Sequence, residues 1–151
     1  NQELGKTARH YFLGATPETM NKLLNQIAMR FPTAQVVGQD CPPFREPTAQ
    51  ELNERDQRIK DSGATVVWVG LGTPKQDFEV QRLADNMKIT AIAVGAAFDF
   101  LAETVPQAPK WIQKSGLEWG YRLAREPRRL AKRYFWGNPQ FIKSVFTHRN
   151  D

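Results

Sequence analysis

The sequence predicts an α/β protein: a Rossmann-like parallel sheet with flanking helices, followed by a basic helical C-terminal appendage. Strand-like apolar runs alternate with helix-like segments four times, at a spacing of roughly 25 to 30 residues that is typical of parallel sheets with right-handed crossovers. The third strand-like run is apolar throughout, as in strands covered on both faces. Each strand ends at or beside a glycine, which allows a tight turn at the edge where such sheets bind ligands.

Three helix starts separate the predicted strands. Thr16-Pro17 supplies an N-cap and a first-turn proline, and Thr73-Pro74 repeats that pattern. Thr48 and Glu51 have the spacing of a capping box. We therefore expect strands at 9–14, 35–38, 65–69 and 90–95, helices from these starts to about Arg30, Gly63 and Met87, and a short helical piece at 98–101.

Size and composition restrict the class of protein. The chain has 151 residues, of which 40% are hydrophobic and 25% charged, and this is enough for one globular core. No apolar run approaches the roughly 20 residues that a membrane span needs. The single cysteine, Cys41, excludes an internal disulfide and fits a reducing compartment. Because the first residue is Asn1 rather than Met, we expect the sequence to be a fragment of a longer protein.

Charge divides the chain into two parts. Residues 109–151 contain ten Lys or Arg and three acidic residues, a charge of about +7, whereas residues 1–108 carry about −2. We therefore expect an α/β body at 1–108 and a basic, aromatic-rich helical appendage at 109–151. Such an appendage can lie in an anionic membrane interface, contact a diphosphate through arginine, follow a nucleic acid, or simply cap the body with solvated charges.

The strongest candidate site is the turn after the third strand, Gly70-Leu71-Gly72-Thr73-Pro74-Lys75-Gln76. It lacks the Gly-Lys-Ser/Thr of a Walker A loop and the third glycine of a dinucleotide fingerprint. Its glycines nonetheless let a ligand approach the backbone, and free N–H groups at a helix start, where Thr73 can cap, attract anions. Lys75 adds a cation and Gln76 a two-way hydrogen-bonding amide. The alternative is an efficient strand-to-helix turn with a solvated lysine.

Other candidate residues carry weaker signals. Asp99, just beyond the fourth strand, could accept hydrogen bonds from a ribose or a base, or it could cap a helix. Asp77 and Glu79 resemble a metal-binding acidic pair, but their place near a helix start favours a simpler role, complementing the helix dipole. His10 and His148 are far apart in the sequence, so we expect neither a metal site nor a Cys/His nucleophilic centre.

Three motifs together resemble one enzyme family. They are VGLGTPKQ at 69–76, VGAAFDFLAETVPQAPKWIQKSGLEWGYRLAREPRRLAKRY at 94–134 and GNPQF at 137–141, and they are similar to the WecG/TagA/CpsF glycosyltransferases, glycosyltransferase family 26. The similarity runs from about Phe12 to Phe146. It implies a bacterial hexosyltransferase at the inner face of the cytoplasmic membrane. Such an enzyme moves a sugar, N-acetylmannosamine or another hexose, from a UDP-sugar to a polyprenyl-diphosphate-linked acceptor, with inversion and without a metal or other cofactor, in cell-wall or exopolysaccharide synthesis.

The resemblance also implies roles for individual residues. Gly72, Thr73, Lys75, Gln76 and Asp99 match motifs that line the nucleotide-sugar pocket, and we place Gly14, at the end of the first strand, in the same site. Arg122, Arg128 and Arg129 match a basic appendage that meets the membrane and the lipid diphosphate. No nucleic-acid partner is expected, and a homo-oligomer stays open.

Two departures from the family pattern restrict these expectations. Family members have a further N-terminal half that carries the aspartate proposed as general base, so we expect the base to lie outside this chain and the isolated chain to be inactive or nearly so. Asp40-Cys41-Pro42-Pro43-Phe44 replaces an aromatic- and glycine-containing loop, so the donor sugar can differ from N-acetylmannosamine. Two other functions stay open, a non-catalytic nucleotide-binding module and a nucleic-acid binder.

Overall fold

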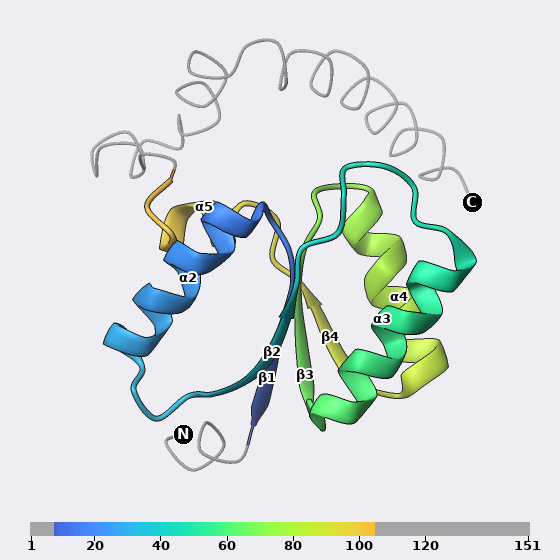
Figure 1. The fold of residues 1–151 in the computed structure, drawn as a ribbon, viewed down its shortest axis with the longest axis horizontal. Helices are drawn as coiled ribbons and strands as arrows, with labels where there is room; N and C mark the ends of the chain where they lie inside the picture. The colour runs from blue at the N-terminus through green and yellow to red at the C-terminus, as the bar shows by residue number, and fades with distance from the viewer. Residues whose placement is uncertain (1–7, 105–151) are drawn as a thin grey trace, which may run out of the picture. The chain divides into compact units, whose positions relative to one another are not determined.

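Figure 1 shows a computed structural model of the chain, which describes residues 8–104. Four strands form one parallel sheet in the order β2-β1-β3-β4. The predicted Rossmann-like α/β fold class is confirmed, whereas the predicted boundary at 108/109 and the helical appendage lie outside the described residues. The strands are β1 (Arg9–Gly14), β2 (Gln35–Asp40), β3 (Val66–Gly70) and β4 (Thr90–Ala93), and the helices are α2 (Pro17–Arg30), α3 (Ala49–Ser62), α4 (Lys75–Met87) and α5 (Ala97–Leu101).

The strand order makes β1 and β3 the two central strands. From β1 the chain first moves outward to β2 and then returns past β1 to form β3 on its other side. The direction of winding therefore reverses between β1 and β3, and open α/β sheets bind ligands at such a switch point, beyond the carboxyl ends of the strands. Gly14 pairs with Gly70, so these two carboxyl ends lie level with each other.

Helices cover both faces of the sheet, α2 and α5 on one side and α3 and α4 on the other (Figure 1). Alternate strand residues point to opposite faces. Leu13, Val67 and Val69 are fully buried on the α3–α4 side, whereas Phe12 packs among α2 and α5. Trp68 contacts that second cluster but is only partly buried. Complete burial under α3 and α4 thus accounts for the apolar residues on one face of β3. Partial burial under α2 and α5 accounts for Trp68 on the other face.

Local capping signals set the ends of α2 and α3 as predicted. Thr16 Oγ1 accepts the N–H of Thr19 at 3.2 Å. Thr48 and Glu51 form both hydrogen bonds of the capping box, and α3 ends at Gly63, whose φ of +64° is a left-handed conformation that favours glycine. Both helices therefore start, and α3 also ends, where their own sequence directs.

Other boundaries differ from the prediction by one or two residues, and β2, β4 and α4 are examples. β2 continues two residues beyond its predicted end, to Asp40. β4 ends at Ala93 because a turn follows at once, in which the N–H of Ala97 donates to the carbonyl of Val94 at 3.1 Å. α4 begins at Lys75, later than the predicted Thr73-Pro74 start.

A buried ionic network joins α3 to α4. Arg55 Nη2 donates to Glu79 Oε1 at 2.6 Å, and both side chains are almost completely buried. Arg82 donates to both carboxylate oxygens of Asp56 at 2.7 Å and also to Glu79. The prediction that Glu79 complements the helix dipole is wrong, because this side chain faces α3 and pairs with two arginines. Asp77 does lie in the first turn of α4, as predicted.

Removing one member of the Arg55–Glu79 pair should destabilise the protein far more than replacing both. Glu79→Leu leaves the Arg55 guanidinium buried without its carboxylate, and such a change costs about 3–5 kcal/mol. Arg55 Nε already has no acceptor among residues 8–104. The double variant Arg55→Met/Glu79→Leu removes this incompletely hydrogen-bonded pair and should recover most of the loss. Urea denaturation in a double-mutant cycle measures the effect, and strictly additive losses would contradict it.

Candidate functional site

The carboxyl ends of β1 and β3 touch backbone to backbone. A Cβ atom on Gly14 would lie 2.4 Å from the carbonyl oxygen of Gly70, so no larger residue fits there without moving one strand. Ala15, the next residue along, donates its N–H to the same Gly70 oxygen at 3.4 Å. The structure therefore gives Gly14 a packing role at the switch point. Its contact with a nucleotide stays a prediction.

The helix that follows the glycine turn, α4, does not have the predicted N-cap. Pro74 occupies the N-cap position of α4 and makes no side-chain cap, so the prediction that Thr73 caps this helix is wrong. The N–H of Gln76 donates to the carbonyl of Gly72 at 2.9 Å, and the N–H of Asp77 donates to Pro74 at 3.0 Å. These bonds close the turn upon itself.

Three backbone amides of the turn are left available. Within the described part of the chain, the N–H groups of Gly72, Thr73 and Lys75 have no acceptor. Gly72 has a φ of +77°, and a Cβ atom on it would meet no atom of residues 8–104 within 4 Å, so no described residue covers this side of the turn. Free amides at the start of a helix attract anions, and that an anion binds at this turn stays a prediction.

Gln76 joins this turn to the end of β4. Its side chain is only 7% exposed. Oε1 accepts the N–H of Gly95 at 3.0 Å, and Nε2 donates to Thr73 Oγ1 at 3.4 Å. The predicted two-way use of this amide is therefore present, but within the protein. Sequence reasoning missed the partner Gly95, although its place at the end of the predicted fourth strand was the available signal.

Phe98 brings α5 to the same edge of the sheet. This buried ring packs against Gly70, where a Cβ atom would lie 2.4 Å from the ring, and lies 5.8 Å from the ring of Phe12. Asp99 is the next residue, partly buried in the first turn of α5. Ala96 is the N-cap of α5, so the alternative that Asp99 caps this helix is wrong. The β3–α4 turn and α5 thus flank the carboxyl end of β3.

Lys75 is paired at the surface. Its Nζ lies 2.8 Å from Glu46 Oε1, and both side chains are largely exposed to solvent. Glu46 comes from the connection between β2 and α3, which therefore reaches the first turn of α4 (Figure 1). No motif indicated this contact. The predicted cation is present at the turn, with an exposed carboxylate as its partner.

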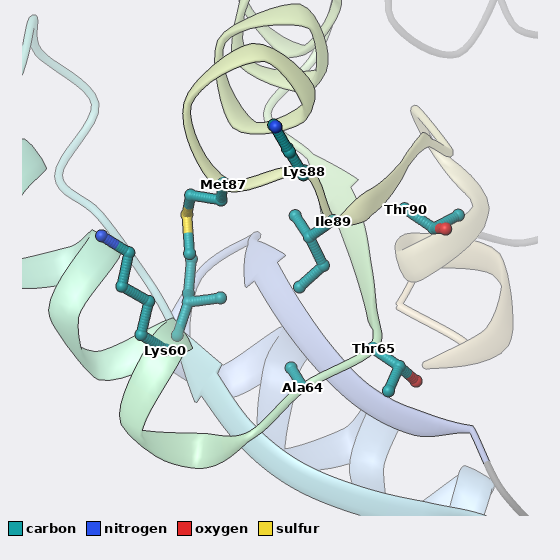
Figure 2. Close-up of a pocket in the computed structure, with 8 residues that line it drawn as sticks. Lys60, Ala64, Thr65, Met87, Lys88, Ile89 and Thr90 are labelled. Atoms are coloured by element: carbon teal, nitrogen blue, oxygen red, sulfur yellow. The ribbon is translucent and has the colours of Figure 1, made fainter.

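A pocket lies at the opposite edge of the sheet (Figure 2). Its volume is about 330 Å³. It opens where α3 and α4 end and where β3 and β4 begin, away from the glycine turn, and so it lends no support to the predicted nucleotide site. Its lining residues are Ile59, Lys60, Ala64, Thr65, Met87, Lys88, Ile89 and Thr90.

Two further predictions concern metal and lipid. Among the residues described, no group of three or more His, Cys, Asp or Glu side chains is placed to hold a metal ion. Arg122, Arg128 and Arg129, predicted to meet a lipid diphosphate, lie outside the described residues, as does His148.

His10 accepts a hydrogen bond from Trp68 Nε1 at 3.2 Å, and burial lowers the pKa of its imidazole.

The packing of Phe98 on Gly70 predicts different outcomes for two glycine substitutions. Gly70→Ala should destabilise the protein by about 1–3 kcal/mol through overpacking and should shift the NMR signals of the Phe98 ring. Gly72→Ala, the matched control, should cost about 1–2 kcal/mol of backbone strain and leave those signals in place, because its Cβ meets open space. Equal shifts of Phe98 in both variants would contradict this packing.

Comparison with known proteins identifies one family. Residues 2–151 match the model of the glycosyl transferase WecG/TagA/CpsF family. Over 144 residues the chain is 26% identical to the N-acetylglucosaminyldiphosphoundecaprenol N-acetyl-beta-D-mannosaminyltransferase of Bacillus spizizenii, an alignment that covers 95% of this chain and 53% of that protein. The chain thus spans about half the length of this relative. Because the family match extends over nearly the whole sequence, the chain belongs to the WecG/TagA/CpsF glycosyltransferase family, as its motifs predicted.

Proposed function

We propose that this chain forms the donor-binding part of an inverting glycosyltransferase, which moves a hexose from a UDP-sugar to a polyprenyl-diphosphate-linked acceptor. The observation that carries the proposal is the glycine turn at the β1–β3 switch point, where three amides have no acceptor among residues 8–104. Membership of a glycosyltransferase family supports the reaction class. The name of the Bacillus relative supports the acceptor, because it specifies a sugar carried on diphosphoundecaprenol.

The diphosphate of the donor lies, in this proposal, against the amides of Gly72, Thr73 and Lys75. Phosphate oxygens would accept these three N–H groups at the positive end of the α4 dipole. The Lys75–Glu46 pair is exposed, and such pairs contribute only about 0–1 kcal/mol. A diphosphate can therefore displace Glu46 at little cost. Lys75 would then stabilise the charge of the departing UDP.

The remaining donor contacts are proposed for α5 and the loop before it. Asp99 lies beyond the carboxyl end of β4, where its carboxylate would accept hydrogen bonds from a ribose or a base. Gln76 would act by holding Thr73 and Gly95 in place, because its amide is engaged with both. Gly14 would keep the two central strands close enough for one ligand to span them.

Transfer would proceed by a single displacement. The acceptor hydroxyl attacks the anomeric carbon, the bond from that carbon to UDP breaks, and a general base takes the hydroxyl proton. We assign that base to no residue of this chain. Because Lys75 and the α4 dipole supply positive charge at the leaving group, we propose that the donor site works without a metal cofactor.

The acceptor lipid would hold the enzyme at the inner face of the cytoplasmic membrane. Arg122, Arg128 and Arg129 are proposed to contact the lipid diphosphate, since arginine's planar fork suits phosphate oxygens. Among the helices within residues 8–104, none is long and apolar enough to cross a membrane. We propose peripheral attachment, with N-acetylmannosamine or another hexose as the transferred sugar.

Calorimetric titration with UDP tests the donor site directly. The chain should bind UDP in preference to AMP and to a short single-stranded oligonucleotide. Asp99→Ala should weaken UDP binding by about 10- to 100-fold, the range expected when a hydrogen bond to a charged group is lost. Gln76→Ala should also weaken UDP binding, because Thr73 and Gly95 lose the side chain that holds them in place. Gln57→Ala is the matched control, because Gln57 is an exposed glutamine paired with Asp61 on α3.

Each alternative function gives its own result in that titration. Preference for the oligonucleotide, with a steep salt dependence, would indicate a nucleic-acid binder. Selective UDP binding without transfer, even when the remainder of the family protein is supplied, would indicate a nucleotide-binding module. A folded sample that binds none of these compounds, with folding checked by circular dichroism, would rule out the proposed donor site.

Lys75 should contribute to UDP binding through charge. Lys75→Gln should weaken UDP binding by about tenfold at low salt and should reduce the salt dependence of the affinity, because exposed charges are screened. Lys60→Gln, at the opposite edge of the sheet, should have no such effect. A loss of affinity that is the same at 0.05 and about 1 M salt would mean that Lys75 acts by packing rather than by charge.

A further inference from the structure

The pocket at the amino edge of the sheet, where β3 and β4 begin, has an apolar lining (Figure 2). Its volume of about 330 Å³ lies at the lower end of the range for small-molecule sites, about 300–1,000 Å³. Ile59 is completely buried in the core cluster on the α3–α4 side. Ala64, Met87 and Ile89 pack against that cluster but are only partly buried, so they present apolar surface to the pocket.

Two lysines add positive charge to this pocket. Lys60 lies in the last turn of α3, and Lys88 is the C-cap residue of α4. Within residues 8–104 neither ammonium forms an ion pair, and the described lining residues include no Asp or Glu. Lysines at helix ends complement the helix dipole, but that role does not require an apolar hollow between them.

The backbone of Lys88 is strained. Its φ of +52° is in the left-handed region, which glycine adopts readily and other residues adopt rarely. The C-cap of α3 has the same conformation but is a glycine, Gly63, with a φ of +64°. Helix stability alone would favour glycine at the end of α4 as well. Lysine at this position costs stability and supplies a second ammonium at the pocket, and backbone strain of this kind clusters at ligand sites.

We propose that this pocket binds a small amphiphilic anion, a carboxylate or phosphate monoester with a short apolar tail. The tail lies against the apolar lining, and the anionic head lies at the two lysines. A purely apolar ligand would leave the two ammonium groups without a counter-charge, and a small inorganic anion would leave the apolar lining in water. The pocket is at the opposite edge of the sheet from the glycine turn, so this site is separate from the proposed donor site.

Carboxylates of different length test the apolar lining. Octanoate should bind the full 151-residue chain at least about tenfold more tightly than butanoate, because each buried methylene strengthens binding about fourfold. The NMR signal of the Met87 methyl group reports binding at this site. The signals of Met20, which is completely buried, and Met29, which is exposed on α2, should stay in place. Equal affinity for the two carboxylates, or a Met29 shift equal to that of Met87, would overturn the proposal.

Octylammonium has a tail like that of octanoate and the opposite charge, so it tests the two cations. Octanoate should bind at least about tenfold more tightly, and salt should reduce the difference because exposed charges are screened. Octyl phosphate, titrated in parallel, shows which of the two anionic heads binds more tightly. Equal affinity for octanoate, octyl phosphate and octylammonium would mean that the lysines do not select the ligand, and the proposal would be wrong.

Two lysine variants separate binding from folding. Lys60→Gln and Lys88→Gly should each reduce the preference for octanoate over octylammonium by about three- to tenfold. Lys88→Gly should also raise the urea midpoint of unfolding, because glycine relieves the left-handed strain. Weaker binding by a more stable protein cannot result from unfolding. Lys22→Gln is the matched control, because Lys22 is an exposed lysine paired with Glu18 on α2. A Lys22→Gln effect equal to that of Lys60→Gln would contradict the proposal.

Saturating UDP distinguishes this site from the glycine turn. Octanoate should shift the Met87 signal with the same affinity whether UDP is present or absent. If UDP abolishes that shift, octanoate binds at the donor site and the proposal is wrong. Octanoate binding by a chain that does not bind UDP supports this site and rejects the donor site alone, whereas UDP binding without octanoate binding rejects this site alone.

Discussion

The close backbone contact between Gly14 and Gly70 is the constraint on which the candidate site depends. With no side chain between them, β1 and β3 end level and in contact, and the chain leaves both strands at one point. Gly70 also leaves room for the ring of Phe98, which carries α5 and Asp99 to the same edge. Two glycines thus bring three separate segments together at one edge of the sheet. A larger residue at either position would separate them.

Buried contacts then fix the segments at that edge. Gln76 is nearly inaccessible and is bonded to both Thr73 and Gly95, so the turn before α4 and the turn after β4 cannot move independently. One turn further along α4, Glu79 is held by Arg55 of α3. In a low-dielectric interior, a buried polar or charged group that loses its partner destabilises the protein. The free amides of the glycine turn are therefore held in position before any ligand arrives.

The sequence predicted those features that depend on neighbouring residues. The caps at Thr16 and Thr48 and the left-handed Gly63 lie within one helical turn of what they stabilise, and the motif around Gly72 is continuous in the chain. The fold class followed from the regular alternation of strands and helices.

Contacts between distant segments could not be predicted in the same way. Arg55 and Glu79 are 24 residues apart, and nothing local marks either as a partner of the other. Glu79 was therefore assigned to the wrong role. Thr73 was also misassigned, because a favourable capping residue precedes Pro74, but the first helical residue is Lys75 and the cap position falls on the proline. Local propensity identifies a helix start without fixing its exact residue.

The exposed contacts at this edge differ physically from the buried ones. Lys75 and Glu46 meet in solvent, where an ion pair contributes little and is readily exchanged for a phosphate. Phe44 and Phe78 expose apolar surface that gains free energy once it is covered. Both kinds of contact are weak because water surrounds them. A ligand at this edge can therefore replace exposed contacts without disturbing the buried bonds that hold the glycine turn.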